Sequence, residues 1–337
     1  MNILPLNLML LFVWWFVFRG RLSKGKRGSD WYLGIVFIQM MLMTLFAPIF
    51  SDAAQYAFHA RLNWYSDFGI GWKLFSQVIW SIWPDAKSLV FFTSLIFELA
   101  FVHFCRRYSN NYALSYFFMV TLGFFGMSLF ILRQTVALAI VLLAYDAVEE
   151  RKLPKFLLLI LIACSFHVTA ILFVALYPIS NLRRKGAFHL GCILAGITLL
   201  LCSTPLSNFM TSHYHSEYVL TGFSGENLLL LMILLVIIYE LRGDNCDRLG
   251  IGHALELAPV FQVLALRFST FTRATRYFQI ATTVAIPNLI ESFQDKRLRF
   301  LATFAVVVFF SFFYIVVQDW AVDGFFDSFV FNGLVMN

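Results

Sequence analysis

Long apolar runs separated by short basic clusters restrict the fold of this sequence more than any other feature. Only 13% of its 337 residues are charged and 60% are hydrophobic, whereas a soluble domain carries about 25% charged residues. Because a membrane helix needs roughly 20 apolar residues, we predict an all-α polytopic membrane protein with about 10 transmembrane helices. The apolar runs lie near residues 3–18, 31–50, 88–105, 112–131, 132–148, 156–180, 187–203, 227–241, 254–271, 277–291 and 300–317.

The basic clusters predict how these helices are oriented, since Lys and Arg collect in cytoplasmic loops. Clusters lie at residues 19–27, 106–107, 151–155 and 296–299. A cytoplasmic position for all of them puts the N-terminus outside. Residues 1–337 then form a single integral membrane domain, with outward loops near 51–87 and 204–226.

The run at 156–180 has a polar interruption, Cys164-Ser165-Phe166-His167. A break there leaves two segments of about 10–12 residues, each reaching roughly to the middle of a membrane. We therefore predict a re-entrant hairpin with His167 near its tip. The alternative is one unbroken span, which would invert every later segment and place the basic residues at 294–299 outside.

Arginines on the predicted outer side are the most informative charges, because a charge inside a bilayer is expensive. Guanidinium groups form paired hydrogen bonds with phosphate oxygens, so Arg133, Arg273 and Arg276 are candidates for binding a pyrophosphate. Arg273 and Arg276 share a helical face because they are three residues apart. The alternative is that these side chains reach the lipid headgroups or pair with carboxylates such as Glu256 or Glu291.

Three outward groups are candidate general bases towards a sugar hydroxyl: Asp52, Asp67 and His167. The plainer alternatives are a helix cap or turn for each aspartate and a core residue for the histidine. A glycine-rich phosphate loop, a serine nucleophile elbow and an HExxH motif are all missing from the sequence. We expect no metal, no cofactor and no nucleic-acid partner.

Several short motifs, taken together, resemble the EpsG family of Wzy-type polysaccharide polymerases over residues 45–290. The motifs are Ser51-Asp52 with Tyr56, Asp67-Phe68-Gly69-Ile70-Gly71-Trp72, Leu132-Arg133-Gln134-Thr135-Val136-Ala137-Leu138-Ala139, Ala163-Cys164-Ser165-Phe166-His167-Val168-Thr169-Ala170-Ile171, and Arg276-Tyr277-Phe278 with Ile286-Pro287.

The resemblance implies a GT-C-like helical architecture in the bacterial cytoplasmic membrane, with a multi-pass chain and an outward-facing active site. The implied reaction moves a growing glycan from undecaprenyl pyrophosphate to the next lipid-linked repeat unit. Gln134 and Tyr277 would be further substrate contacts, and aromatic residues of the outer loops would stack on sugar rings. The implied partners are an undecaprenyl-pyrophosphate-linked oligosaccharide and membrane lipids, with a chain-length regulator and a flippase as compatible protein partners.

Three other functions remain open on sequence alone. An O-antigen ligase shares the donor but normally carries a larger outer loop. A transporter or lipid-linked sugar flippase usually has an inverted repeat, which we do not find in the sequence. A membrane O-acyltransferase would use His167 as its catalytic residue, but its coenzyme A phosphates would lie on the cytoplasmic side, away from the arginines.

Overall fold

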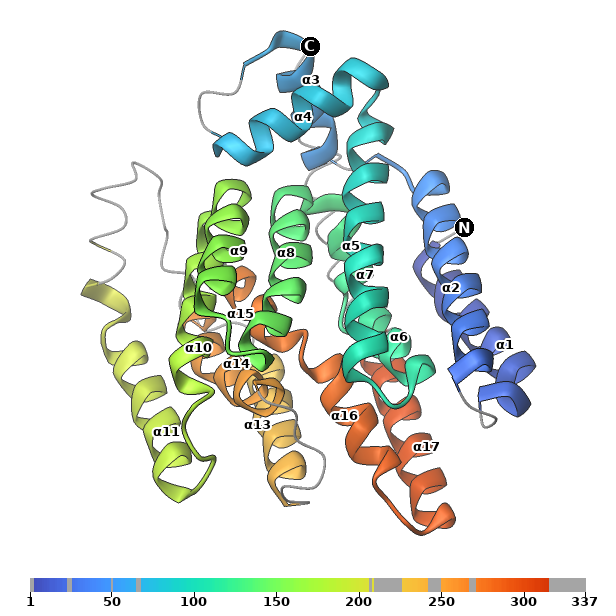
Figure 1. The fold of residues 1–337 in the computed structure, drawn as a ribbon, viewed down its shortest axis with the longest axis vertical. Coiled ribbons are helices and arrows are strands. Elements are labelled where there is room, and N and C mark those ends of the chain that lie inside the picture. The colour runs from blue at the N-terminus through green and yellow to red at the C-terminus, as the bar shows by residue number, and fades with distance from the viewer. Residues whose placement is uncertain are drawn as a thin grey trace. The chain divides into compact units, whose positions relative to one another are not determined.

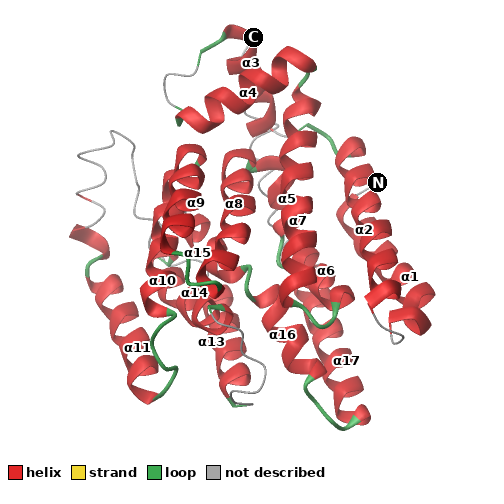
Figure 2. Ribbon diagram, viewed as in Figure 1, coloured by secondary structure: helices red, strands yellow, loops and turns green. Residues whose placement is uncertain are grey.

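The computed structural model describes residues 3–22, 26–49, 51–64, 68–205, 208, 226–241, 250–266 and 271–314. Within these ranges every regular element is a helix, as Figure 1 and Figure 2 show. The all-α prediction is therefore confirmed. The chain divides into two compact units, residues 1–139 with 290–337 and residues 140–289.

The first unit contains a helical pair, α2 (Lys26–Phe46) and α5 (Ala86–Tyr108), whose ends are joined by polar contacts. Lys87, at the start of α5, donates to the carbonyl oxygen of Leu45 at 2.9 Å and also to that of Ala47, where α2 ends. At the opposite end, Arg106 of α5 pairs with Asp30 of α2 at 2.7 Å. The two helices therefore run antiparallel. The unit contains α1 (Ile3–Leu22), α2 (Lys26–Phe46), α3 (Ser51–Leu62), α4 (Ile70–Ile82), α5 (Ala86–Tyr108), α6 (Tyr112–Thr121), α7 (Phe124–Phe130), the start of α8 (Leu132–Glu149) and α17 (Lys296–Phe313).

Of the described helices, α5 is the one that is long and apolar enough to cross a membrane by itself. The pair α6 and α7 passes the same test together, with a bend of 53° between them. Gly123 lies at this bend with a φ of 80°, a conformation that glycine adopts without steric cost. The number of about 10 spans stays a prediction, since the apolar stretches of the other described helices, such as Leu6–Phe18 in α1 and Asp30–Phe46 in α2, are shorter than 18 residues.

The segment 51–87, which the sequence predicts as an outward loop, is largely helical, and its outward position stays a prediction. It contains two helices, α3 and α4, which pack on each other and on α5. Asn63 closes α3 with a positive φ of 52°, which asparagine tolerates better than most residues. Its side-chain oxygen accepts a hydrogen bond from Gln77 of α4 at 2.8 Å. The second predicted loop, 204–226, lies almost entirely outside the described residues.

The second unit holds the rest of α8 and the hairpin that the sequence predicts. Gly250 lies directly before α14 (Ile251–Ala265) and has a φ of 90°, a conformation that favours glycine. A Cβ at this position would also lie only 3.1 Å from Val148 of α8. The unit contains α9 (Leu153–Phe166), the 3-10 helix η1 (Val168–Ala175), α10 (Leu176–Ile179), α11 (Gly186–Leu201), α13 (Glu226–Glu240), α14 (Ile251–Ala265), α15 (Thr272–Gln279) and most of α16 (Thr282–Glu291).

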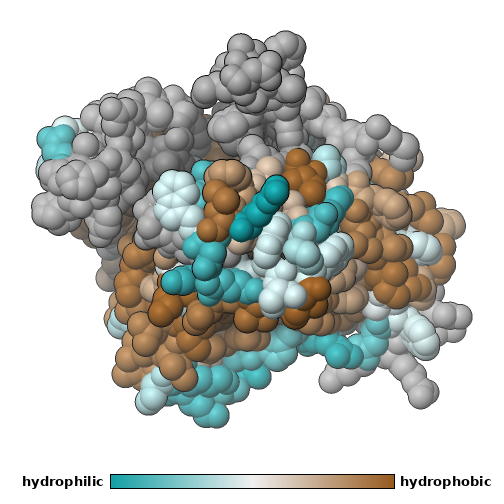
Figure 3. Space-filling view, turned by 90° about the horizontal axis from the view of Figure 1, so that it is seen from above, coloured by the Kyte–Doolittle hydropathy of each residue, from teal (hydrophilic) through white to brown (hydrophobic). Residues whose placement is uncertain are grey.

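Apolar side chains are exposed along whole helical faces. On α11, for example, Leu190, Ile193, Leu194 and Ile197 are each 50–59% exposed. Figure 3 shows hydrophobic atoms, in brown, over much of the visible surface of the described residues. Patches of this extent are unusual on soluble monomers and typical of surfaces that face lipid.

Candidate functional site

The hairpin at 153–180 turns back where the sequence predicts a break. Its two ends lie together, because Arg151 donates to the Ser180 hydroxyl and carbonyl oxygens, each at 3.0 Å. Further along, the rings of Phe156 and Tyr177 are 5.1 Å apart. α9 ends at Phe166, and His167 adopts an extended backbone with φ −148° and ψ 112°. His167 is therefore at the tip, between α9 and η1.

A chain of polar contacts fixes the imidazole of His167. Its Nδ1 lies 2.6 Å from the hydroxyl oxygen of Thr169, and that hydroxyl donates to the hydroxyl of Tyr277 at 3.4 Å. When Thr169 donates to Tyr277, its oxygen accepts the proton on Nδ1 of His167. This arrangement leaves the lone pair on Nε2, which is the atom that can accept a proton.

α15 packs directly against this hairpin. The rings of Phe278 and Phe173 are 5.3 Å apart, and Phe278 stacks on Phe261 at 4.7 Å. The backbone carbonyl of Tyr277 accepts a hydrogen bond from Tyr145 at 3.2 Å. Residues more than 100 positions apart in sequence, at the hairpin tip and in α15, thus form one cluster in the second unit.

The two arginines of α15 have different surroundings. Arg273 is exposed, whereas Arg276 is half-buried and donates to the side-chain oxygen of Gln279 at 3.0 Å. Both arginines lie in α15, three residues apart.

Arg133, in the first unit, is enclosed by aromatic rings. Its Nε donates to the hydroxyl of Tyr56 at 3.1 Å, and its guanidinium carbon lies 4.9 Å from the ring centre of Phe68 and 5.6 Å from that of Tyr56. Trp72 packs against Tyr56, with the two rings tilted by 59° and their centres 4.9 Å apart. We call these four residues, Arg133, Tyr56, Phe68 and Trp72, the arginine cage. Tyr56 and Trp72 are buried, so they support Arg133 and do not form the open sugar platforms that the sequence suggests.

The remaining predicted residues are placed as follows. Gln134 and Tyr277 are fully buried. Asp67 lies outside the described residues, as does the side chain of Asp52, whose backbone is in the first turn of α3. Thr169 and Tyr56 were not among the predicted site residues, although both belong to the motifs given above. The sequence feature that could have identified Thr169 is a hydroxyl two residues after the histidine. No sequence spacing connects Tyr56 with Arg133.

Among the described residues, His189, Glu240 and Glu256 have ligand atoms within 4.8 Å of one another and could in principle hold a cation. The side chain of Arg184 is 5% exposed and lies 3.1 Å from Glu240 and 3.7 Å from Glu256. Nδ1 of His189 lies 2.8 Å from Glu256. Arg184 already supplies positive charge to both carboxylates. The geometry therefore favours an ion-pair cluster that joins α11, α13 and α14.

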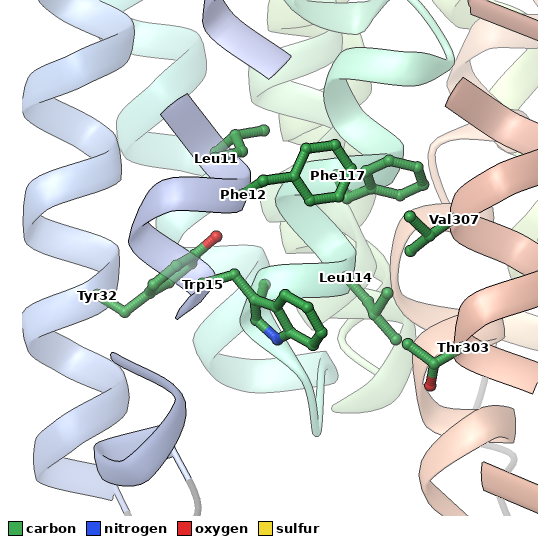
Figure 4. Close-up of a pocket in the computed structure, with 9 residues that line it drawn as sticks. Leu11, Phe12, Trp15, Tyr32, Leu114, Phe117, Thr303 and Val307 are labelled. Atoms are coloured by element: carbon green, nitrogen blue, oxygen red, sulfur yellow. The ribbon is translucent and has the colours of Figure 1, made fainter. Parts of the chain in front are cut away.

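A small pocket in the first unit lies between α1, α2, α6 and α17 (Figure 4). Only Tyr32 and Thr303 bring hydroxyl groups to it, and none of the predicted site residues lines it. Its lining contains no cationic side chain, so it is poorly suited to binding a phosphate. Its lining residues are Leu11, Phe12, Trp15, Tyr32, Ala113, Leu114, Phe117, Thr303 and Val307.

Helices with exposed apolar faces, together with these polar clusters, define a helical membrane protein. The family model of the EpsG family matches residues 47–324, and the chain therefore belongs to the EpsG family. The resemblance found in the sequence is confirmed. Membership supports a role in polysaccharide biosynthesis. Neither the curated proteins nor the solved structures contain a match to this chain.

Proposed function

We propose that this protein is a polysaccharide polymerase, a membrane glycosyltransferase that acts on the outer side of the cytoplasmic membrane. It transfers a growing glycan from undecaprenyl pyrophosphate to a lipid-linked repeat unit. The observation that carries this proposal is the match to the EpsG family over residues 47–324. The side-chain geometry then supplies the groups that such a reaction needs.

The transfer needs a proton acceptor for the hydroxyl group of the acceptor sugar. That oxygen attacks the anomeric carbon of the donor glycan, the bond from this carbon to the pyrophosphate oxygen breaks, and the hydroxyl proton leaves. Nε2 of His167 is suited to take the proton, because Thr169 holds Nδ1 at 2.6 Å. Asp52 and Asp67 remain alternative bases within the same proposal.

The leaving group is a lipid pyrophosphate that gains negative charge as the bond breaks. Arginine stabilises such charge through its paired hydrogen-bond donors. Arg273 and Arg276 lie on the helix that packs against the hairpin of His167, which makes them our first choice for this role. Arg133 is held in a fixed orientation by its cage, and this reduces the entropy lost on binding an anion.

Replacing Arg273 or Arg276 with Ala tests the proposal. Each variant should insert into the membrane normally but lose long glycan chains, and Arg276→Lys should recover less than full activity because lysine lacks the planar pair of donors. Arg297→Ala is the matched control, since Arg297 is an exposed arginine in the first turn of α17. Full-length polymer in both alanine variants would remove the pyrophosphate site.

The glycan profile also separates polymerase from the other functions. Loss of a polymerase leaves single repeat units on the lipid carrier. Loss of an O-antigen ligase would leave long chains unattached, and loss of a flippase would leave repeat units on the cytoplasmic side. Either of the last two profiles would contradict the proposal.

A further inference from the structure

α4 has three distinct faces. One face is buried and contains Trp72, Ser76 and Ile79. A second face is aliphatic and exposed, and a third is polar. The aliphatic face consists of Ile70, Leu74, Val78 and Ile82, which recur every four residues and are each 56–68% exposed. The polar face consists of Lys73, Gln77 and Ser81.

α4 lies at one end of the apolar part of α5. α4 crosses that end of α5 in Figure 1 and is joined to it by only three residues, 83–85. Lys87 and Arg106 are 19 positions apart along α5. At 1.5 Å per residue this is about 29 Å, close to the hydrocarbon thickness of about 30 Å. The polar contacts of Lys87 and Arg106 thus lie where the two membrane surfaces would be.

Arg106 and Arg107 assign the C-terminal end of α5 to the cytoplasmic surface, because basic residues collect on that side of a membrane. Lys87, and α4 with it, then belongs to the outer surface. Trp64 and Trp83 are exposed beside α4, at 53% and 39%. Tryptophan is enriched at the level of the lipid headgroups, so both residues agree with this position.

We infer that α4 is an interfacial helix that lies in the plane of the outer leaflet, with Ile70, Leu74, Val78 and Ile82 inserted among the lipid chains. The buried face then rests on the protein and the polar face meets the headgroups and water, which accounts for all three faces. An amphipathic helix of this kind lies in the interface without crossing it. The inference does not depend on which reaction the protein catalyses.

The same helix positions the arginine cage. Trp72 of α4 packs against the ring of Tyr56, and Tyr56 accepts the hydrogen bond of Arg133. Insertion of α4 would therefore hold the guanidinium of Arg133 at the level of the outer headgroups. A lipid-linked diphosphate has its charge at that same level. This consequence rests on the proposed function, whereas the insertion itself does not.

Site-directed fluorescence in vesicles tests the insertion. The five native cysteines are first replaced by serine, and the full chain is reconstituted into phosphatidylethanolamine and phosphatidylglycerol vesicles. A bimane label is then attached to single cysteines: Leu74→Cys and Val78→Cys on the aliphatic face, Gln77→Cys and Ser81→Cys on the polar face. Leu99→Cys, exposed near the middle of α5, serves as the depth reference. Matching elution volumes and melting temperatures confirm that the labelled variants fold.

Labels at positions 74 and 78 should lose fluorescence to lipids spin-labelled near the carbonyl group more than to lipids labelled near the chain end. Labels at 77 and 81 should instead be quenched by aqueous iodide, and the label at 99 by the deeper spin label. Iodide quenching at 74 and 78 as strong as at 81 would overturn the inference. So would protection from both quenchers, which would indicate a protein partner, or stronger quenching by the deep label, which would indicate a spanning helix. A catalytically inactive Arg276→Ala protein should give the same pattern, so failure of the proposed reaction and failure of the insertion are distinguishable.

Discussion

Removal of the Thr169 hydroxyl is the sharpest test of how His167 is held. Thr169→Val keeps the shape of the side chain but deletes the oxygen that lies 2.6 Å from Nδ1 of His167. The imidazole would then be free to rotate or to change tautomer. We therefore expect the substitution to lower the rate of polymerisation while the protein stays folded.

The size of the effect follows from the contacts. A hydrogen bond of this kind is worth about 0.5–1.5 kcal/mol, which corresponds to a loss of about 2- to 13-fold in rate. His167→Ala removes the proton acceptor itself and should cost about 10²- to 10⁴-fold. Tyr277→Phe should cost about twofold or less, because its contact with Thr169, at 3.4 Å, is longer than the usual 2.5–3.0 Å.

The assay is the initial rate at which purified protein in detergent extends lipid-linked repeat units, followed on gels. Thr169→Ser, which retains the hydroxyl, should recover most of the activity. In the double variant of Thr169→Val with His167→Ala, the rate should equal that of His167→Ala alone, because Thr169 acts through His167. An unchanged rate in Thr169→Val would refute this reasoning, and so would a fully additive loss in the double variant.

Three further substitutions test other parts of the structure. Tyr56→Phe removes the hydrogen bond to Arg133 but keeps the ring, and should lower the yield of long glycans at least about tenfold, since a bond to a charged group is worth about 1.5–3 kcal/mol; a normal glycan profile would contradict the role of the cage. Arg184→Met removes the guanidinium from the buried Glu256 and the partly exposed Glu240, and leaves them only the imidazole of His189. It should lower the free energy of unfolding by about 3 kcal/mol, the lower end of the range for a broken buried ion pair, whereas Arg183→Met, at an exposed neighbour, should leave the melting temperature in detergent unchanged. Gly250→Ala forces a side chain into a positive φ against Val148 and should destabilise by about 1–3 kcal/mol; an equal or higher melting temperature would show that the backbone there adapts.

The sequence predicted those parts of the fold that depend on long apolar runs and their interruptions. The turn at His167 and the helix that begins at Leu132 are both found where the pattern indicates them. An interruption of four residues in an apolar run is a local signal, and the backbone responds to it locally. The helices α3 and α4 were missed because they mix polar, aromatic and aliphatic residues, and neither contains a run long enough to suggest a membrane helix.

The site was predicted less completely, for a different physical reason. Candidate cations and bases can be selected by residue type, but a partner such as Tyr56 is 77 residues away from Arg133 and no spacing connects them. Contacts of this kind arise only from tertiary packing. Tyr56 and Trp72 were expected at the surface because they lie in a predicted loop, whereas α3 and α4 turn both side chains inward.

The bonds between Arg151 and Ser180 have a consequence for membrane topology as a whole. Since they hold the two ends of residues 153–179 together, that segment contributes no net crossing, whatever depth its tip reaches. Reporter domains fused just before and just after it should consequently be found in the same compartment. The chain would then leave the hairpin on the side of the membrane from which it entered.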